Sequence, residues 1–305
     1  MGKRPPESPH SEAALGLGAI ALAATLWALA AAVARDLFDD GVDPLELVQA
    51  RALLSAVGLG LLPAAWKTRG PGDPWGVVAL GLSIALVNGF YYLALERLAV
   101  AVALVLQYTG PALVVAWIAA TTRRAPSPQI LVSLAAAFVG VVLVSEVLAG
   151  DIGALNEVGI AFGFGSAVMF ATYTLVSERA GATYGVLGAL FRGFAVATLM
   201  WIAFQVPRGW PSSLTAPDNL PRVVFVGLAG TLLPFILYLW GVERVRAERA
   251  VIAATLEPVI AGVVAWVWLD QILSPLQLAG GALIIAAVSS LQVRHAPKHI
   301  APVPD

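Results

Sequence analysis

The stretch FYYLALERLAVAVALVLQYTGPALVVAW, residues 90–117, decides the fold because it is almost wholly apolar and occurs twice in the chain. A related stretch, LYLWGVERVRAERAVIAATLEPVIAGVV, fills residues 237–264, 147 positions later and without a gap. The chain therefore contains an internal repeat. Its register is marked by these matched pairs: Tyr91 and Tyr238, Glu96 and Glu243, Arg97 and Arg244, Ala103 and Ala250, Pro111 and Pro258, and Pro128 and Pro275.

The composition is that of a membrane protein. Of 305 residues, 59% are hydrophobic and only 12% are charged, whereas soluble domains carry about 25% charged residues. Apolar runs of about 20 residues, the length that crosses a bilayer as a helix, recur along the chain. They lack the alternation of a transmembrane barrel. We therefore predict an all-α polytopic membrane protein.

Pro, Gly and charged residues separate the apolar runs and mark the expected ends of the helices. Residues 1–12 and 295–305 are polar and are predicted to be cytoplasmic tails. Ten transmembrane helices are predicted, at residues 13–34, 44–65, 74–96, 98–121, 128–148, 157–179, 183–206, 221–243, 248–269 and 274–294.

The distribution of Lys and Arg predicts the orientation, because these residues stay on the cytoplasmic side. With the amino terminus inside, the cytoplasmic segments hold twelve of them. The opposite side holds four, and two lie within spans. Both termini are therefore predicted to be cytoplasmic, with the chain in the inner membrane of the cell. The four on the opposite side are Arg35, Arg97, Arg208 and Arg222.

The repeat unit has five helices, since the offset carries the third, fourth and fifth helices onto the eighth, ninth and tenth. Five is an odd number, so the second copy enters the membrane from the opposite side. We predict two inverted repeats, residues 13–148 and 157–294, around a central cavity. Inverted repeats are a recurrent architecture of transporters that work by alternating access. A duplicated structural or enzymatic membrane protein is the alternative.

Several short motifs accompany this plan: Trp27 in TLWAL, Arg51 in VQARALLSA, and the two repeated stretches with the later LQLAGGALIIA. With them, the chain resembles the drug/metabolite transporter superfamily, specifically its EamA-type ten-helix exporters, over residues 13–294. The resemblance implies export of amino acids or other small metabolites. It is most similar to the branch that exports aromatic or a broad range of amino acids.

Glu257 is the acidic residue predicted nearest the membrane midplane, and intramembrane carboxylates are costly and often functional. It precedes Pro258, which removes a backbone donor and favours a kink. A cation site, a proton site, a contact for a substrate ammonium and a structural hydrogen bond all remain open. Pro111, Pro234 and Pro258 are predicted gating kinks, with static packing kinks as the alternative.

Polar and aromatic side chains recur at mid-depth in the predicted spans. A Tyr hydroxyl inside a membrane needs a partner, which either a watery cavity or a neighbouring helix supplies. We favour a cavity, whose mostly neutral lining suits zwitterionic or amphipathic small solutes. The predicted substrate-binding residues are Trp27, Asn88, Tyr92, Gln107, Tyr108, Tyr173, Tyr238 and Glu257.

Two arginines, Arg51 and Arg192, lie well inside the second helix of each half. Long Arg side chains reach back to the membrane interface. We therefore interpret both as snorkelling or as structural ion pairs rather than as substrate contacts.

Several functions are disfavoured by the residues that the chain lacks. It has no Cys, and its three His lie in the tails, so no metal site or cofactor is expected. No ATP-binding motif and no long basic block for nucleic acid is present. We predict a small-molecule transporter in the lipid bilayer, compatible with a monomer, and favour facilitated diffusion over proton exchange. A translocator of lipids or other hydrophobic metabolites, or less favourably an intramembrane enzyme, is the alternative.

Overall fold

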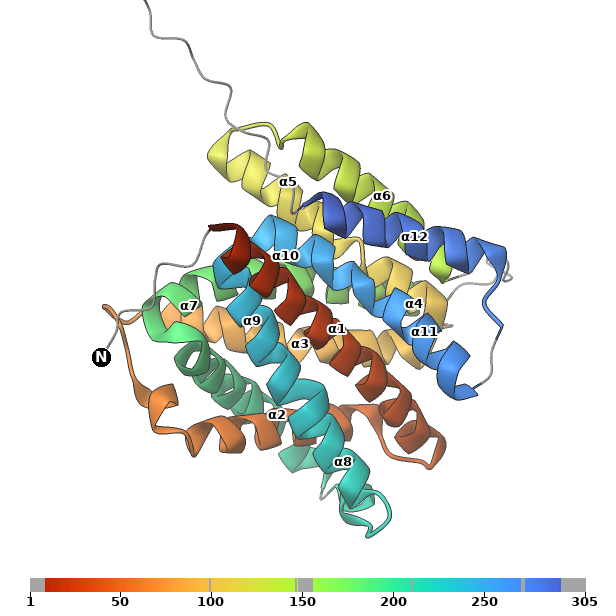
Figure 1. Ribbon diagram of the computed structural model, residues 1–305. Helices are drawn as coiled ribbons and strands as arrows, with labels where there is room; N and C mark the ends of the chain where they lie inside the picture. The colour runs from red at the N-terminus through yellow and green to blue at the C-terminus, as the bar shows by residue number, and fades with distance from the viewer. Residues whose placement is uncertain are drawn as a thin grey trace, which may run out of the picture.

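The computed structural model describes residues 9–98, 100–145, 147, 156–209, 211–269 and 272–291. Within these ranges the regular elements are all helical, so the all-α part of the predicted fold class is confirmed for them (Figure 1). The α-helices are α1 (Pro9–Asp39), α2 (Pro44–Gly60), α3 (Pro74–Leu95), α4 (Val100–Gln107), α5 (Gly110–Thr122), α6 (Pro128–Val144), α7 (Glu157–Gln205), α8 (Leu220–Gly227), α9 (Leu233–Val245), α10 (Ala247–Ala253), α11 (Glu257–Leu269) and α12 (Pro275–Ser290).

Short helical turns join some of these helices. Four are 3₁₀ turns: η1 (Pro63–Trp66), η3 (Val206–Arg208), η4 (Ser212–Thr215) and η6 (Ala254–Leu256). A π-helical turn, η5 (Leu228–Leu232), lies between α8 and α9. Five described helical stretches are long and apolar enough to cross a membrane: 12–39, 74–95, 102–122, 157–208 and 220–245. Two shorter apolar helices, α6 and α12, accompany them.

Four helices begin with the same local signal, a capping side chain followed by Pro. The cap accepts hydrogen bonds from backbone N–H groups of the first turn, and Pro occupies a position whose N–H has no partner within the helix. These starts lie within one residue of the predicted ones, because the signal is local in sequence. The cap and Pro pairs open α2 (Asp43, Pro44), α3 (Asp73, Pro74), α6 (Ser127, Pro128) and α12 (Ser274, Pro275).

Two helices are present where 157–179 and 183–206 were predicted, and they meet inside α7. Only Gly185 leaves helical geometry, with φ 70° and ψ 165°, and it marks the boundary between them. The chain therefore changes direction at one residue, without a loop. At the other end, α1 begins at Pro9, four residues before the predicted start. Residues 1–8 and 292–305, with most of both predicted tails, lie outside the described residues.

Replacing Gly185 by Ala is expected to destabilise the protein by about 1–3 kcal/mol, because this backbone region is almost closed to residues with a Cβ. The new methyl group would also lie 3.1 Å from the Arg69 guanidinium. Thermal unfolding in detergent should show a lower midpoint. Gly70→Ala is the matched control, since Gly70 has open space around its Cβ position. Equal midpoints for the two variants would contradict the expectation.

Three predicted spans are interrupted near their prolines. Pro111 lies in the first turn of α5, Pro234 in that of α9 and Pro258 in that of α11. Each follows a departure from α-helical geometry: the turn at Thr109, the π-helical turn η5, and the 3₁₀ turn η6. Proline cannot donate to the carbonyl four residues earlier, so the helix is locally reorganised before it.

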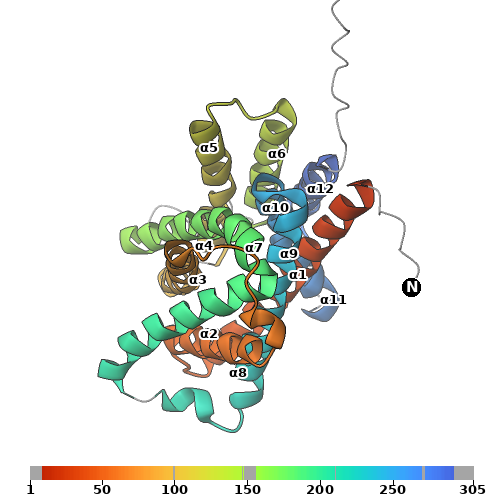
Figure 2. The same cartoon turned by 90° about the vertical axis from the view of Figure 1, so that its left-hand side faces the viewer.

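The helices pack in long pairs: α3 along α7, α1 along α9, and α6 along α12. In both cartoon views α5, α6 and α12 lie at one end of the molecule, and α2 and α8 lie at the other (Figures 1 and 2). The pairs α3–α7 and α1–α9 lie between these ends. The middle of the molecule is therefore built from helices of both halves of the sequence.

The backbones of α6 and α12 approach each other closely at two glycines. A Cβ atom built on Gly140 would lie 2.8 Å from the Gly280 carbonyl oxygen, and one on Gly280 would lie 2.7 Å from the Gly140 carbonyl. Farther along the same seam, the hydroxyls of Ser133 and Ser290 are hydrogen-bonded at 2.7 Å. Small residues at such positions allow helices to approach closely in a membrane.

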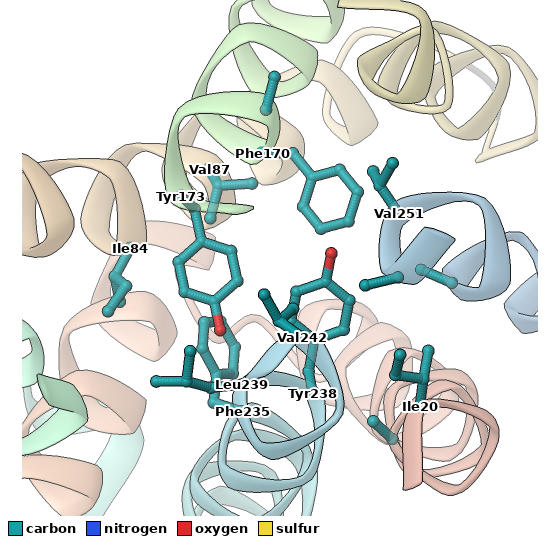
Figure 3. Close-up of a cluster of buried hydrophobic side chains, with 14 of the residues drawn as sticks. Ile20, Ile84, Val87, Phe170, Tyr173, Phe235, Tyr238, Leu239, Val242 and Val251 are labelled. Atoms are coloured by element: carbon teal, nitrogen blue, oxygen red, sulfur yellow. The ribbon is translucent and has the colours of Figure 1, made fainter. Parts of the chain in front are cut away.

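An aromatic cluster fills the centre between α7 and α9. Figure 3 shows Phe170 and Tyr173 from α7 around Tyr238 from α9, with Ile20 and Val251 at the edge of the group. The rings of Tyr173 and Tyr238 stack with centroids 5.7 Å apart, and both side chains are fully buried. Phe170 and Tyr173 line the cavity described next.

Candidate functional site

A cavity of about 80 Å³ lies at the centre of the helices. Its walls come from α1, α2, α3, the end of α4, α7, α9, η6 and α11. The structure brings together seven of the eight predicted substrate-binding residues around it. The lining consists of Trp27, Ala30, Ala31, Arg51, Val87, Asn88, Tyr91, Tyr92, Gln107, Tyr108, Phe170, Tyr173, Phe235, Ala254 and Glu257.

Tyr238 is the predicted residue that the structure does not place in this lining. Its hydroxyl lies 3.0 Å from that of Thr174, which satisfies it on the side of α7. Its ring lies 5.5 Å from the ring of Trp27 and 5.7 Å from that of Tyr173. Tyr238 therefore supports two lining side chains from behind.

Arg51 is the lining residue whose interpretation from sequence was wrong. The side chain is 5% exposed and points into the helix bundle rather than toward an interface. Its Nε donates to the Thr231 hydroxyl at 2.6 Å, and its Nη1 donates to the Tyr92 hydroxyl at 2.7 Å. Its Nη2 donates to the Gly230 carbonyl at 3.3 Å. All three acceptors are neutral, and among the described residues no ion pair involves Arg51.

Arg192 behaves differently from Arg51. It is half-buried and donates from Nη1 to the backbone carbonyls of Ala65 and Gly188, at 3.1 and 3.0 Å. It therefore holds the turn after α2 against α7 and does not line the cavity.

Glu257 opens α11 and lines the cavity opposite the uncompensated cation. Its Oε2 accepts a hydrogen bond from the Tyr108 hydroxyl at 2.8 Å. Glu257 and Arg51 interact electrostatically, but no ion pair within 4.0 Å joins them in the described part of the chain. The cavity thus separates one buried cation from one carboxylate.

Two prolines affect this polar lining through the backbone carbonyls four residues earlier, to which a proline cannot donate a hydrogen bond. Pro234 has no N–H to give to the Gly230 carbonyl four residues earlier, and that carbonyl accepts from Arg51. Pro258 likewise cannot donate to the Ala254 carbonyl; that carbonyl accepts the backbone N–H of Glu257 and lies 3.2 Å from the Tyr108 hydroxyl. Arg51 therefore satisfies the backbone group released at Pro234, as a membrane interior requires.

Two other polar residues of the lining, Gln107 and Asn88, are held by hydrogen bonds within the protein. Gln107 donates from Nε2 to the Ser166 hydroxyl at 3.0 Å, and Asn88 donates from Nδ2 to the Ile84 carbonyl at 3.1 Å. The buried Tyr173 hydroxyl has no hydrogen-bond partner among the described residues. An unsatisfied buried hydroxyl beside a cavity is a group that a bound solute or water can satisfy.

The sequence held one signal for the position of Arg51. Arg51 shares a face of α2 with Leu47, Ser55 and Leu59 at intervals of four residues, and all four are buried. Residues four apart lie on the same face of a helix, so the apolar and small neighbours mark a face that packs inward. Aromatic residues that were not singled out, Tyr91, Phe170 and Phe235, also line the cavity.

The arrangement supports the binding of a small solute. Within the described ranges no group of three or more His, Cys, Asp or Glu residues could hold a metal ion. The cavity offers a cation, a carboxylate, amides, hydroxyls and aromatic faces within one small space. These groups suit a small solute that has both polar and apolar parts.

Known proteins are similar to the chain at the level of sequence and of fold. Threonine/homoserine exporter RhtA of Escherichia coli (strain K12) is 29% identical over 220 residues, which are 72% of each chain. A probable terminal-alkyne amino-acid exporter of Streptantibioticus cattleyicolor is 29% identical over 184 residues, covering 55% of this chain and 61% of that protein. A protein of known crystal structure, 22% identical, shares the fold with a TM-score of 0.68, covering 92% of this chain and 96% of that one.

A family-level comparison covers most of the sequence. The EamA-like transporter family matches the chain over residues 14–146 and again over residues 157–291. These two ranges contain the cavity-lining residues from both halves of the sequence. The chain therefore belongs to the EamA-like transporter family and is a multi-pass membrane transporter.

Proposed function

We propose that the protein exports amino acids as a secondary transporter that works by alternating access. The observation that carries the proposal is the central cavity, which is lined from both halves of the chain by opposite charges, hydroxyls and aromatic rings. The printed names of two relatives, a threonine/homoserine exporter and a probable terminal-alkyne amino-acid exporter, support amino acids as the substrate class.

The transport mechanism that we propose uses two inverted repeats of five helices, residues 13–148 and 157–294. Matched contacts support it. Glu12 on α1 lies 3.3 Å from Arg244 on α9. The offset of 147 carries Glu12 to Gly159 and relates Arg97 to Arg244, and a Cβ built on Gly159 would lie 3.0 Å from the Arg97 Cβ. This contact between the two halves thus has a counterpart in which the halves exchange roles.

The three prolines are proposed to be the gating kinks. Pro111, Pro234 and Pro258 each stand where a helix departs from α geometry, and the carbonyls four residues before Pro234 and Pro258 contact cavity side chains. A change in these hydrogen bonds would transmit the effect of a bound substrate from the cavity to the ends of the helices. With the Lys and Arg distribution of the sequence, we place both termini in the cytoplasm and the protein in the inner membrane.

The size of the cavity favours small substrates. At about 80 Å³, it is well below the 300–1,000 Å³ of pockets for drug-sized ligands. We therefore rank small amino acids above aromatic ones. Translocation of lipids is the second candidate, but the grooves between outer helices are lined mainly by apolar side chains, such as Leu15, Leu22 and Leu237. The polar groups that a lipid headgroup needs lie in the central cavity instead.

Export can be tested in cells that overproduce the protein. Such cells should tolerate inhibitory amino acids and their analogues at higher external concentrations than cells with an empty vector, and should release more of them. Purified protein in proteoliposomes should release a preloaded amino acid faster than protein-free vesicles. The proposal fails if a broad amino-acid panel shows no change in tolerance, in efflux and in vesicle release.

A further inference from the structure

We propose that Arg51 and Glu257 form a two-point site for a zwitterion, in which Arg51 binds the α-carboxylate and Glu257 binds the α-ammonium of one amino-acid molecule. This assignment rests on the proposed function, because it specifies how the exporter would hold its substrate. It also adds a requirement: a good substrate must carry both charges, on groups attached to the same carbon.

The first argument is the unused capacity of Arg51. A guanidinium has five N–H donors, and the three bonds that Arg51 makes leave one N–H on Nη1 and one on Nη2. A carboxylate can accept from two such groups at once. The present acceptors of Arg51 are neutral, and a buried cation is costly until an anion compensates its charge.

The second argument is the matching capacity of Glu257. Tyr108 donates to its Oε2, and no described residue donates to its Oε1. An ammonium group supplies three donors and a positive charge. Bound at Oε1, it would give Glu257 the cationic partner that no described side chain gives within 4.0 Å.

The two charges are complementary to a zwitterion because they line the same small cavity without touching. A ligand with only a carboxylate or only an ammonium would leave one of them uncompensated. The ligand's side chain would then face the aromatic part of the lining, which Trp27, Phe170 and Phe235 provide. The unsatisfied Tyr173 hydroxyl is available to a polar side chain.

The two anchors belong to different repeats, and neither is duplicated. The offset of 147 relates Arg51 to Thr198 and Glu257 to Gly110. A bound amino acid would therefore join the first half of the chain to the second. Binding would draw together the two parts that must move relative to each other, which links occupancy of the site to the change of access.

The test uses the full-length protein in proteoliposomes and measures how well unlabelled compounds compete with labelled L-threonine for transport. L-threoninamide keeps the ammonium but lacks the carboxylate, and 2,3-dihydroxybutyrate keeps the carboxylate but has a hydroxyl in place of the ammonium. In the wild type, L-threonine should compete at concentrations at least about tenfold lower than either analogue, as expected for the loss of one charge-assisted hydrogen bond.

Two variants then test which residue binds which charged group of the substrate. Arg51→Gln should weaken competition by L-threonine by about tenfold or more and leave that by L-threoninamide unchanged. Glu257→Gln should weaken competition by L-threonine and leave that by 2,3-dihydroxybutyrate unchanged. Arg192→Gln, which removes an arginine outside the cavity, is the matched control and should compete like the wild type.

The possible failures are distinguishable. If the wild type transports no amino acid, the proposed function fails and this assignment fails with it. If the wild type transports amino acids but L-threonine and both analogues compete equally, the assignment alone is wrong. It is also wrong if Arg51→Gln weakens competition by L-threonine and L-threoninamide by the same factor, because that result describes a structural role for Arg51.

Discussion

Replacing Gly280 by Leu is expected to prevent the protein from reaching its folded state in useful amounts. The backbones of α6 and α12 approach so closely that even a Cβ atom on Gly280 would lie 2.7 Å from a carbonyl oxygen of Gly140. Overpacking a core by a few methylenes typically costs about 1–3 kcal/mol. Here the rigid backbone is the obstacle, so we expect a loss of at least about 3 kcal/mol. The yield of monodisperse protein after detergent extraction measures the effect.

Gly18→Leu is the matched control for this substitution. Gly18 is exposed on α1, and no atom lies within 4 Å of its Cβ position. The same side chain added there should leave yield and thermal midpoint near those of the wild type. If Gly280→Leu also extracts and unfolds like the wild type, the close seam between α6 and α12 is not a feature of the folded protein.

Replacing Glu257 by Gln is expected to slow transport strongly without changing the response to a pH gradient. The slower rate follows from the loss of the charged contact with the substrate ammonium, worth about tenfold or more at low substrate concentration. The unchanged response follows from facilitated diffusion. A zwitterion has no net charge, and the two charges of the site also cancel, so no proton is needed for the crossing.

A proton-coupled exporter would behave differently. One pH unit is equivalent to about 1.4 kcal/mol per proton, or about tenfold accumulation of the substrate. Transport into vesicles with and without an imposed gradient therefore separates the two mechanisms. Glu243→Gln, an exposed carboxylate at the end of α9, is the control. If the gradient drives the wild type strongly and Glu257→Gln loses only this drive, facilitated diffusion is wrong and Glu257 carries the proton.

Much of the helical plan could be predicted because its signals are local. Helix starts at Pro44, Pro74, Pro128 and Pro275 depend on a capping residue and a proline that are adjacent in sequence. The polar residues of the cavity could also be predicted, since a polar side chain at mid-depth in a membrane needs an internal partner. The depth of a residue in the membrane follows from its position within a predicted transmembrane span.

The direction in which a side chain points around the helix axis cannot be predicted so simply from the sequence. Arg51 was expected to reach the interface or to form an ion pair, but Tyr92 on α3 and two residues of η5 hold it inside. These partners are 41 to 180 residues away in sequence. Tyr238 was expected in the cavity, but a bond to Thr174 keeps its hydroxyl at α7. The change of direction within α7 similarly depends on Gly185, whose conformation no neighbouring sequence motif predicts.

The seam between α6 and α12 has a consequence for the origin of the chain. Gly140 corresponds to Ala287 under the offset of 147, and Gly280 corresponds to Ser133. The approach of the two glycines thus has its counterpart near Ser133 and Ala287. There the hydroxyl of Ser133 bonds that of Ser290, which also donates to the Ala287 carbonyl at 2.7 Å. In the inverted repeats proposed above, this surface would meet its own copy and would be isologous, like the interface of a two-fold homodimer. On that proposal, a half-length ancestor inserted in both orientations would already have possessed this interface, so gene fusion would have needed to supply only a linker.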